Sequence, residues 1–371
     1  MKSFEYGDAE FGSQEVVFAV SSMVIGFGVL TLPRTLAAAT KSSDGWMAVI
    51  MGGLVALAFG WLIGKLAARF PGQGFRDIVS SVANRSLGNA LSVVFALYTL
   101  TFVGYETRGL ANIAKLYLFD RTPEEAICFF FMLVLAYGVS GPSIGLLRLN
   151  VLFLPLVLLI VLVVLALSTA DFNIHNLQPV FVTDWSDVLV SSRETVFSFL
   201  GFEVLLFYNT WNNKPRQTPK AIVAGLSIPL ALYLLVFFFV IGIFGSAVAQ
   251  NTLYPTAELA KQVEIPGGFF ERFESLFFMI WVMTLFNTAA MAFDVTIVAM
   301  REVMPKLKRI TAIVVLSPVV YLIAMQPQNV KEIDLFGEWI SYSGLVIGWA
   351  LPTLLLLVSI LRRKKGHERQ A

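Results

Sequence analysis

The sequence has few charged residues, one cysteine and two histidines, and each shortage excludes a class of protein. Only 14% of the 371 residues are charged, whereas about 25% is usual for a soluble domain. A lone cysteine, Cys128, excludes a disulfide framework, and His175 and His367 stand far apart. No spacing indicates a metal site, a nucleophile–base pair or a phosphate loop, so neither an enzyme nor a cofactor is expected. The formal charge of +2 does not indicate nucleic-acid binding.

The chain is instead rich in long apolar stretches. The residues AVILMFWYC make up 57% of the chain, and the mean hydropathy is +0.75. A helix needs about 20 apolar residues to cross a bilayer, and the stretches do not alternate as barrel strands do. The sequence therefore predicts an all-α integral membrane protein with ten transmembrane helices. The expected spans are Val16–Pro33, Gly45–Gly64, Ser86–Tyr105, Ala126–Leu147, Leu149–Ala170, Thr195–Asn213, Ala221–Ser246, Ser275–Phe293, Ile310–Gln326 and Trp339–Leu361.

The distribution of Lys and Arg predicts the orientation. With ten spans, eighteen basic residues fall on the side of the two termini and six on the opposite side. Cytoplasmic loops carry the excess of Lys and Arg in membrane proteins. Both termini, including a basic tail at 362–371, are therefore expected in the cytoplasm.

An internal repeat relates the two halves of the chain. Residues 25–30, Ile-Gly-Phe-Gly-Val-Leu, resemble residues 200–205, Leu-Gly-Phe-Glu-Val-Leu, at an offset of 175 that maps span one onto span six. Five spans in each half place the second copy upside down in the membrane. The prediction is one transmembrane domain of two inverted repeats, about 13–170 and about 187–361, in which helices 1 and 6 are discontinuous.

Interrupted helices near the bilayer centre predict a binding site. Backbone N–H and C=O groups freed there need polar partners, so such breaks usually line a cavity. Helix ends offer N–H groups to a carboxylate and carbonyls to an ammonium, which suits a small zwitterion such as an amino acid. The alternative is that Gly26, Gly28 and Gly201 only allow close helix packing. Packing is the preferred interpretation for Gly60-x-x-x-Gly64, which has no counterpart in the other half.

Ionisable residues inside spans are candidate functional groups. Glu203 lies within span six, where it would hold a ligand ammonium or pair with a distant arginine, two alternatives that remain open. Glu106 and Arg108 end span three, where an ion pair or snorkelling to the interface competes with ligand contact.

Spans three and eight supply further candidates. Tyr98 and Phe102 share a face of span three, although an aromatic stripe is more often packing. Asn287, at the centre of apolar span eight, needs a hydrogen-bond partner. Span five, in contrast, has no ionisable or hydroxyl side chain before Ser168, which weakens the case for proton coupling.

Five motifs resemble one family in order along the whole chain: residues 26–34 (GFGVLTLPR), 105–108 (YETR), 199–204 (FLGFEV), 254–256 (YPT) and 269–275 (FFERFES). The chain is similar to the B subunit of spore germinant receptors, a branch of the amino acid–polyamine–organocation (APC) transporter superfamily. The resemblance implies a LeuT-like fold, the spore inner membrane, partner A and C subunits, and binding of a nutrient germinant. The ligand contacts it implies are Gly26, Phe27, Gly28, Val29, Leu30, Tyr98, Phe102, Leu200, Gly201, Phe202, Glu203 and Asn287.

Two functions follow from these observations. The first is a receptor subunit in which a small nutrient, an amino acid by preference, binds between helices 1 and 6 and triggers germination with partner subunits. The alternative is a stand-alone amino-acid/proton transporter. A third possibility, a purely structural subunit, predicts that changes at Gly201 or Glu203 leave the nutrient response intact.

Overall fold

The computed structural model describes residues 10–263 and 273–366, which form a bundle of helices with one isolated β-bridge between Phe11 and Asn212. Within these ranges six helices are long and apolar enough to cross a membrane. They are α3 (Gly45–Arg69), α5 (Arg85–Tyr117), α7 (Ser143–Leu167), α10 (Thr218–Ala249), α12 (Phe273–Val303) and the continuous helix of α14 (Val330–Gly344), a π-helical stretch (Leu345–Ala350) and α15 (Leu351–Leu361).

Shorter helices complete the bundle. α1 (Ser13–Val24) and α2 (Gly28–Thr40) together pass the same test but are bent by 51° at the break between them. The other short helices are α4 (Phe75–Val82), α6 (Glu124–Gly138), α8 (Trp185–Ser198), α9 (Leu205–Tyr208), α11 (Pro255–Gln262) and α13 (Arg309–Ala324).

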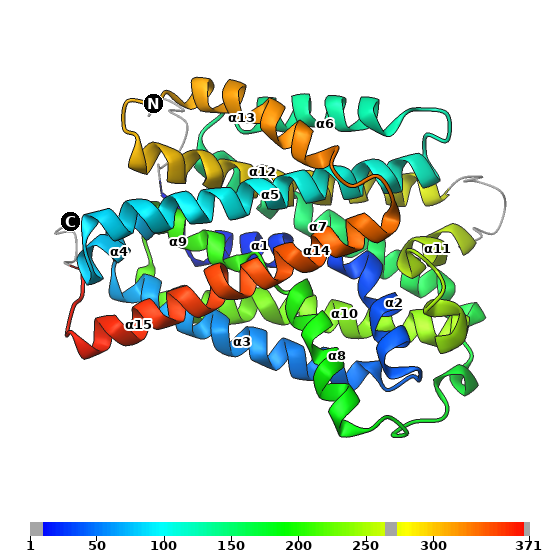
Figure 1. The fold of residues 1–371 in the computed structure, drawn as a ribbon. Helices are drawn as coiled ribbons and strands as arrows, with labels where there is room; N and C mark the ends of the chain where they lie inside the picture. The colour runs from blue at the N-terminus through cyan, green and yellow to red at the C-terminus, as the bar shows by residue number, and fades with distance from the viewer. Residues whose placement is uncertain (1–9, 264–272, 367–371) are drawn as a thin grey trace, which may run out of the picture.

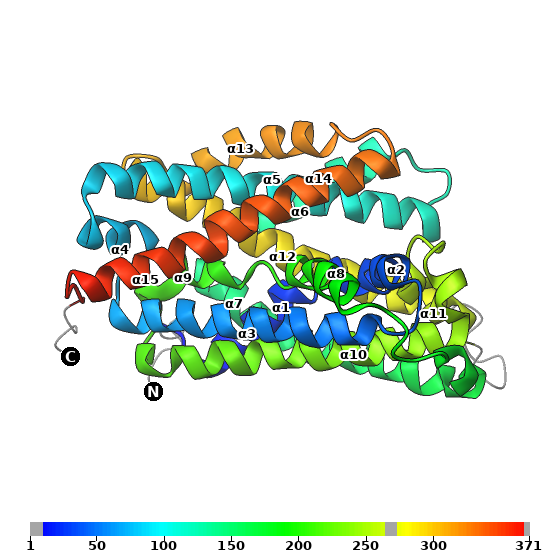
Figure 2. The ribbon, with the colours of Figure 1, turned by 60° about the horizontal axis from the view of Figure 1, so that its bottom comes forward.

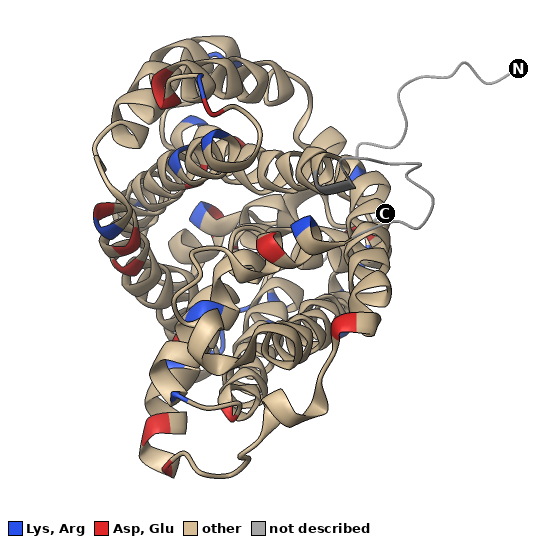
Figure 3. Cartoon of the chain, turned by 90° about the vertical axis from the view of Figure 1, so that its right-hand side faces the viewer, with Lys and Arg blue, Asp and Glu red and all other residues tan. Residues whose placement is uncertain are grey.

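The bundle exposes an apolar outer surface. The long helices run side by side along one axis, and α8 crosses them (Figures 1 and 2). Seen along that axis, acidic and basic residues are few on the ribbon (Figure 3). Large apolar side chains such as Leu152, Leu159 and Leu354 are more than half exposed on the outside. Such a surface suits lipid, and the chain is a multi-pass membrane protein.

Glycines bring α3 against α10. A methyl group at Gly60 would lie 2.4 Å from Leu226 Cδ1, and one at Gly64 would lie 2.5 Å from Pro219 Cα. A side chain at Gly64 would push the two helices apart, because it meets backbone, whereas one at Gly60 would require the Leu226 side chain to move. The packing interpretation of Gly60-x-x-x-Gly64 is therefore confirmed.

Several helix boundaries differ from the predicted ones: α5 and α12, for example, continue to Tyr117 and Val303 and do not end at Tyr105 and Phe293. Two of the differences have a local cause in the sequence. α6 ends at Gly138 and α7 begins at Ser143, so the turn lies before Pro142 and not at Arg148. The reason is that proline disfavours helical geometry in the residue before it. The last helix begins at Val330 and not at Trp339, because the Asn329 side chain accepts a hydrogen bond from the Glu332 backbone N–H (3.1 Å) and caps it.

Prolines inside two helices leave carbonyls that distant hydroxyls satisfy. A proline at position i cannot donate to the carbonyl at i−4. Pro33 of α2 thus frees the Val29 carbonyl, which accepts a hydrogen bond from Thr256 Oγ1 (2.8 Å) in α11. Pro229 of α10 frees the Gly225 carbonyl in the same way, and Ser21 Oγ donates to it (2.7 Å). These bonds join segments more than 200 residues apart.

Candidate functional site

Residues 25–27 separate α1 from α2. α1 ends at Val24 and α2 begins at Gly28, which leaves carbonyls at the end of the first helix and N–H groups at the start of the second. Gly26 in this segment and Gly28 at the start of α2 are closely approached: a methyl group would lie 3.2 Å from Thr288 Oγ1 at Gly26 and 2.9 Å from the Tyr233 hydroxyl at Gly28. A larger residue at Gly28 would require the Tyr233 and Ser198 side chains to move, and one at Gly26 would require the Thr288 side chain to shift by a few tenths of an ångström.

A second interruption lies between α8 and α9. α8 ends at Ser198, and the chain turns through Gly201, whose φ of +118° is strained for any residue with a side chain. One 3₁₀ turn, Phe202–Val204, then leads into α9. A methyl group at Gly201 would lie 3.4 Å from the Met23 carbonyl, near the end of α1. The two interruptions are therefore neighbours in space.

Tyr233 of α10 links the two interruptions. Its hydroxyl lies 2.6 Å from the Val24 carbonyl and 3.2 Å from the Ser198 carbonyl, which belong to the last residues of α1 and α8. Tyr233 is buried, and the sequence analysis did not select it. The signal was present, because a tyrosine hydroxyl in the middle of an apolar span needs a hydrogen-bond partner.

Glu203 contacts the second interruption itself. Its Oε2 accepts the Gly201 backbone N–H (2.9 Å), and its Oε1 accepts the hydroxyl of Tyr98 in α5 (3.0 Å). A methyl group at Gly348, in the π-helical stretch, would lie 2.7 Å from Glu203 Cδ. The carboxylate thus lies fully buried between three segments, and neither of its described hydrogen bonds comes from an arginine.

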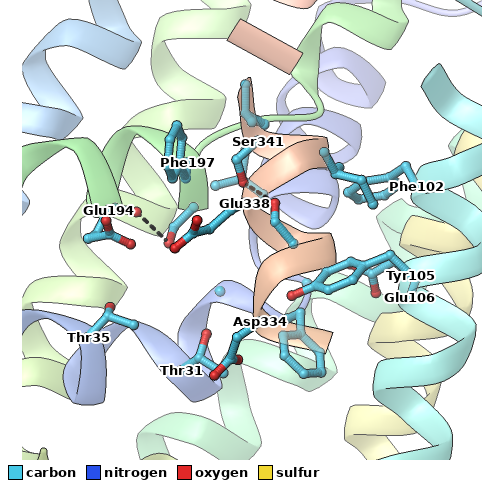
Figure 4. Close-up of a pocket in the computed structure, with 18 of the residues that line it drawn as sticks. Thr31, Thr35, Phe102, Tyr105, Glu106, Glu194, Phe197, Asp334, Glu338 and Ser341 are labelled. Carbon is cyan, nitrogen blue, oxygen red and sulfur yellow. Dashed lines mark hydrogen bonds between the residues drawn. The ribbon is translucent and has the colours of Figure 1, made fainter. Parts of the chain in front are cut away.

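A cavity of about 250 Å³ adjoins the first interruption. Its walls come from residues 23–28, α2, α5, α8, Leu200 and α14 (Figure 4). Thr31 and Thr35 represent α2 in the close-up, and Glu338 and Ser341 represent α14. Phe27 closes one side, with its ring edge-on to Tyr105 at 5.6 Å between centroids. The cavity is thus built from both halves of the chain.

Glu106 of α5 is the buried acid of this cavity. Its side chain is 2% exposed, its Oε2 has no hydrogen-bond partner, and its Oε1 would lie 3.5 Å from a methyl group at Gly26. Arg108 does not line the cavity and pairs with Glu124 of α6 (2.7 Å). A buried carboxylate oxygen without a partner is costly, so a cationic or hydrogen-bond-donating ligand would be favoured beside it.

The other charges around the cavity are mostly paired. Arg34 of α2 contacts both carboxylate oxygens of Asp334 in α14 at 3.1 Å, and Glu194 of α8 pairs with Arg193 at 3.1 Å. Glu338 lies exposed on α14. Four carboxylates and one guanidinium therefore line the cavity, and this excess of negative charge favours a ligand with a positive group.

The structure divides the residues predicted from sequence into three sets. Gly26, Phe27, Gly28, Phe102 and Leu200 line the cavity. Val29, Leu30, Tyr98, Gly201, Phe202 and Glu203 are buried beside the interruptions but do not line it. Asn287 in α12 is buried, and its amide nitrogen has no hydrogen-bond partner. Residues 269–272 of the fifth motif, residues 1–9 and residues 367–371 of the tail lie outside the described residues.

The arrangement of the helices is the fold shared by the LeuT-fold transporters. The chain superimposes on MhsT, solved in complex with L-phenylalanine, with a TM-score of 0.62 over 93% of this chain and 88% of that chain, at 14% identity. A family model described as "Spore germination protein" matches residues 12–333, so the chain belongs to that family. Spore germination protein GerLB of Bacillus cereus is 37% identical over 99% of this chain and 98% of its own length. YndE of Bacillus subtilis (strain 168), also a spore germination protein, is 31% identical over 94% of this chain and 96% of its own length.

Nothing in the described residues indicates catalysis. No group of three or more His, Cys, Asp or Glu among them has the arrangement of a metal site. Cys128 is buried and its Sγ lies 3.8 Å from the Thr107 carbonyl.

Proposed function

We propose that the chain is the ligand-binding membrane subunit of a spore germinant receptor, and that its ligand is a small nutrient with a protonated amine, such as an amino acid. The observation that carries the proposal is the free carboxylate oxygen of Glu106 beside the start of α2. The ammonium of the ligand would contact Glu106, and its carboxylate would accept the N–H groups of the first turn of α2. Phe102 and Leu200 would contact its side chain.

The size of the cavity supports a ligand of this class. At ~30 Å³ per water, a volume of about 250 Å³ corresponds to roughly eight waters, or a molecule with about that many non-hydrogen atoms. Among the similar structures, MhsT was solved with an amino acid. Membership of the spore germination family supports the germinant role.

The proposal includes the architecture expected from the sequence. Each interrupted pair, α1 with α2 and α8 with α9, would be one discontinuous span in a set of ten, and residues 13–170 and 187–361 would be inverted repeats of one domain. The proximity of Gly201 to Met23 supports this reading. The shared contacts of Tyr233 support it as well. Both termini would face the cytoplasm from the spore inner membrane.

Signalling would depend on the partner A and C subunits. A ligand shifts a two-state equilibrium only when it binds one state more tightly than the other. Because the cavity walls come from both proposed repeats, a ligand there would have unequal contacts if the repeats rock against each other. The partner subunits would then detect the shifted state. Glu203 would act by holding the second interruption through Gly201 and Tyr98 and not by direct contact with the ligand.

Ligand-induced thermal stabilisation of the purified chain tests the proposal. A panel of amino acids and sugars is screened, and at least one amine is expected to raise the melting temperature, since a ligand at 100 times its Kd contributes about 2.7 kcal/mol. Glu106→Gln should abolish the response. Glu302→Gln is the matched control, because Glu302 in α12 also has a carboxylate oxygen without a partner but lies outside the cavity. Stabilisation of Glu106→Gln equal to that of the native chain would refute the role of Glu106.

A stand-alone amino-acid transporter is the second candidate, and the transporter fold favours it. Uptake of a radiolabelled amino acid by this chain alone in proteoliposomes would support it. A nutrient response that needs the partner subunits, without uptake by the chain alone, supports the receptor.

A further inference from the structure

A second hollow lies at the opposite end of the bundle from α2. It is a groove of about 1020 Å³ between α3 and α15, at the end where α15 terminates. One wall is apolar: the side chains of Trp61, Leu357 and Ile360 are 46%, 53% and 51% exposed. These residues belong to helices that are long and apolar enough to span a membrane, so this exposed wall suits contact with lipid chains.

The end of the groove is basic. Lys65, Arg69 and Lys365 line it, and none of the lining residues is acidic. Lys65 Nζ lies 4.9 Å from the centroid of the Trp61 ring, so the cation stands directly above the apolar wall. Lys65 and Lys365 are exposed, and neither has an acidic partner among the described ion pairs.

The chain itself holds this basic end in place. Arg69 Nε donates to the Lys364 carbonyl (2.8 Å), and the Gly366 N–H donates to the Arg69 carbonyl (3.0 Å). The segment after α15 is thereby fixed against the end of α3. The three cations are therefore gathered by folded backbone and are not scattered along a free tail.

We infer that this groove binds a phospholipid with an anionic headgroup. Its phosphate would lie among Lys65, Arg69 and Lys365, and an acyl chain would lie along Trp61, Leu357 and Ile360. Only an amphipathic anion would contact both the basic end and the apolar wall. A free phosphate would leave the apolar wall uncovered, and an acidic peptide has no long apolar chain to lie along it. Basic pockets between membrane helices on the cytoplasmic side take such headgroups. The site is separate from the nutrient cavity and does not depend on its function.

Native mass spectrometry of the full chain tests the inference with phosphatidylglycerol and phosphatidylcholine of identical acyl chains. We expect phosphatidylglycerol to bind more tightly. The double variant Lys65→Gln/Lys365→Gln should weaken its binding about 30-fold, since each basic residue near a membrane surface contributes about fivefold to the attraction of anionic lipid. The matched control is Lys220→Gln/Lys306→Gln, which removes two exposed lysines outside the groove and should bind like the native chain.

Three results would overturn the inference: equal binding of the two lipids, equal losses in the two double variants, or displacement of phosphatidylglycerol by inorganic phosphate at matching concentration. Brominated phosphatidylglycerol gives a second measurement on a folded protein. It should quench a component of tryptophan fluorescence that Trp61→Phe removes. Quenching unchanged by that substitution would show that the lipid lies elsewhere.

Discussion

The hydrogen bond from Thr256 to the Val29 carbonyl gives a sharp test of how α2 is held in the bundle. The reasoning assigns this bond to the proline four residues later, because Pro33 has no N–H to offer the carbonyl. Thr256→Val keeps the shape of the side chain and removes the donor. Both Thr256 and Val29 are at most 2% exposed, so water cannot replace the hydroxyl.

The expected cost follows from the unsatisfied carbonyl. A buried acceptor left without a partner destabilises a protein by about 1–3 kcal/mol. In a Pro33→Ala background the backbone N–H of residue 33 restores the helical bond to Val29. The cost of Thr256→Val should then fall below about 1 kcal/mol, which gives a coupling energy of about 1–2 kcal/mol between positions 33 and 256.

A double-mutant cycle measures this coupling as the free energy of unfolding in mixed micelles under increasing denaturing detergent. Thr252→Val is the control, because the Thr252 hydroxyl, just beyond the end of α10, donates to the nearby Val248 carbonyl (2.9 Å) at an exposed site. It should cost at most about 0.5 kcal/mol. If Thr256→Val costs the same with proline or alanine at position 33, the assignment of the bond to the missing N–H is wrong.

Three further predictions concern Asp44, which lies between α2 and α3, and the two interruptions. Asp44 is buried, which raises its pKa, but the backbone N–H groups of residues 181–183 (2.6–2.9 Å) outweigh burial and lower it below 3.8. The contribution of Asp44 to stability should therefore be complete above pH ~4 and be lost as the pH falls through the lowered pKa. Acid unfolding curves of Asp44→Asn should lack that loss. Tyr233→Phe leaves two carbonyls without its hydroxyl and should lower the unfolding free energy by about 1–3 kcal/mol; an unchanged value would contradict the link. Tyr98→Phe and Glu203→Gln should be non-additive by about 0.5–3 kcal/mol in the same assay, since they share one hydrogen bond, whereas additive costs would show that the bond contributes nothing.

The membrane class and most of the apolar helices could be predicted from the sequence, because lipid exposure is a local property of composition. The helix boundaries were harder to predict from the sequence. Hydropathy could not place the start of the last helix, since α14 carries Asp334 and Glu338 into the cavity region. The cap formed by Asn329 and Glu332 was a sequence signal for the start of this helix. The charged residues of the same stretch favoured a loop instead, so the two signals conflicted.

The position of Glu106 shows why the site was only partly predictable. Phe102 and Glu106 are four residues apart and share a face of α5, whereas Glu106 and Arg108 are two apart and cannot face each other on a helix. Helical spacing was therefore a signal that could have placed Glu106 with Phe102 in the cavity wall, although the sequence analysis did not select Glu106 as a ligand contact. The partner of Arg108, Glu124 in α6, was not predictable because it depends on how α5 and α6 pack.

Contacts between distant segments determine the arrangement of the helices, which the periodicity of the sequence could not predict. Burial of apolar surface gives little drive for helices to associate in lipid, because the surrounding chains are equally apolar. Specific polar bonds and close glycine contacts must then select the arrangement, and here they join α1 to α10 through Ser21, α2 to α11 through Thr256, and α1 and α8 to α10 through Tyr233. Each partner is an ordinary hydroxyl residue in its own stretch of sequence. Its role is set by a carbonyl that a proline or an interrupted helix leaves free elsewhere, so the rule for finding such residues is to search for the free carbonyl first.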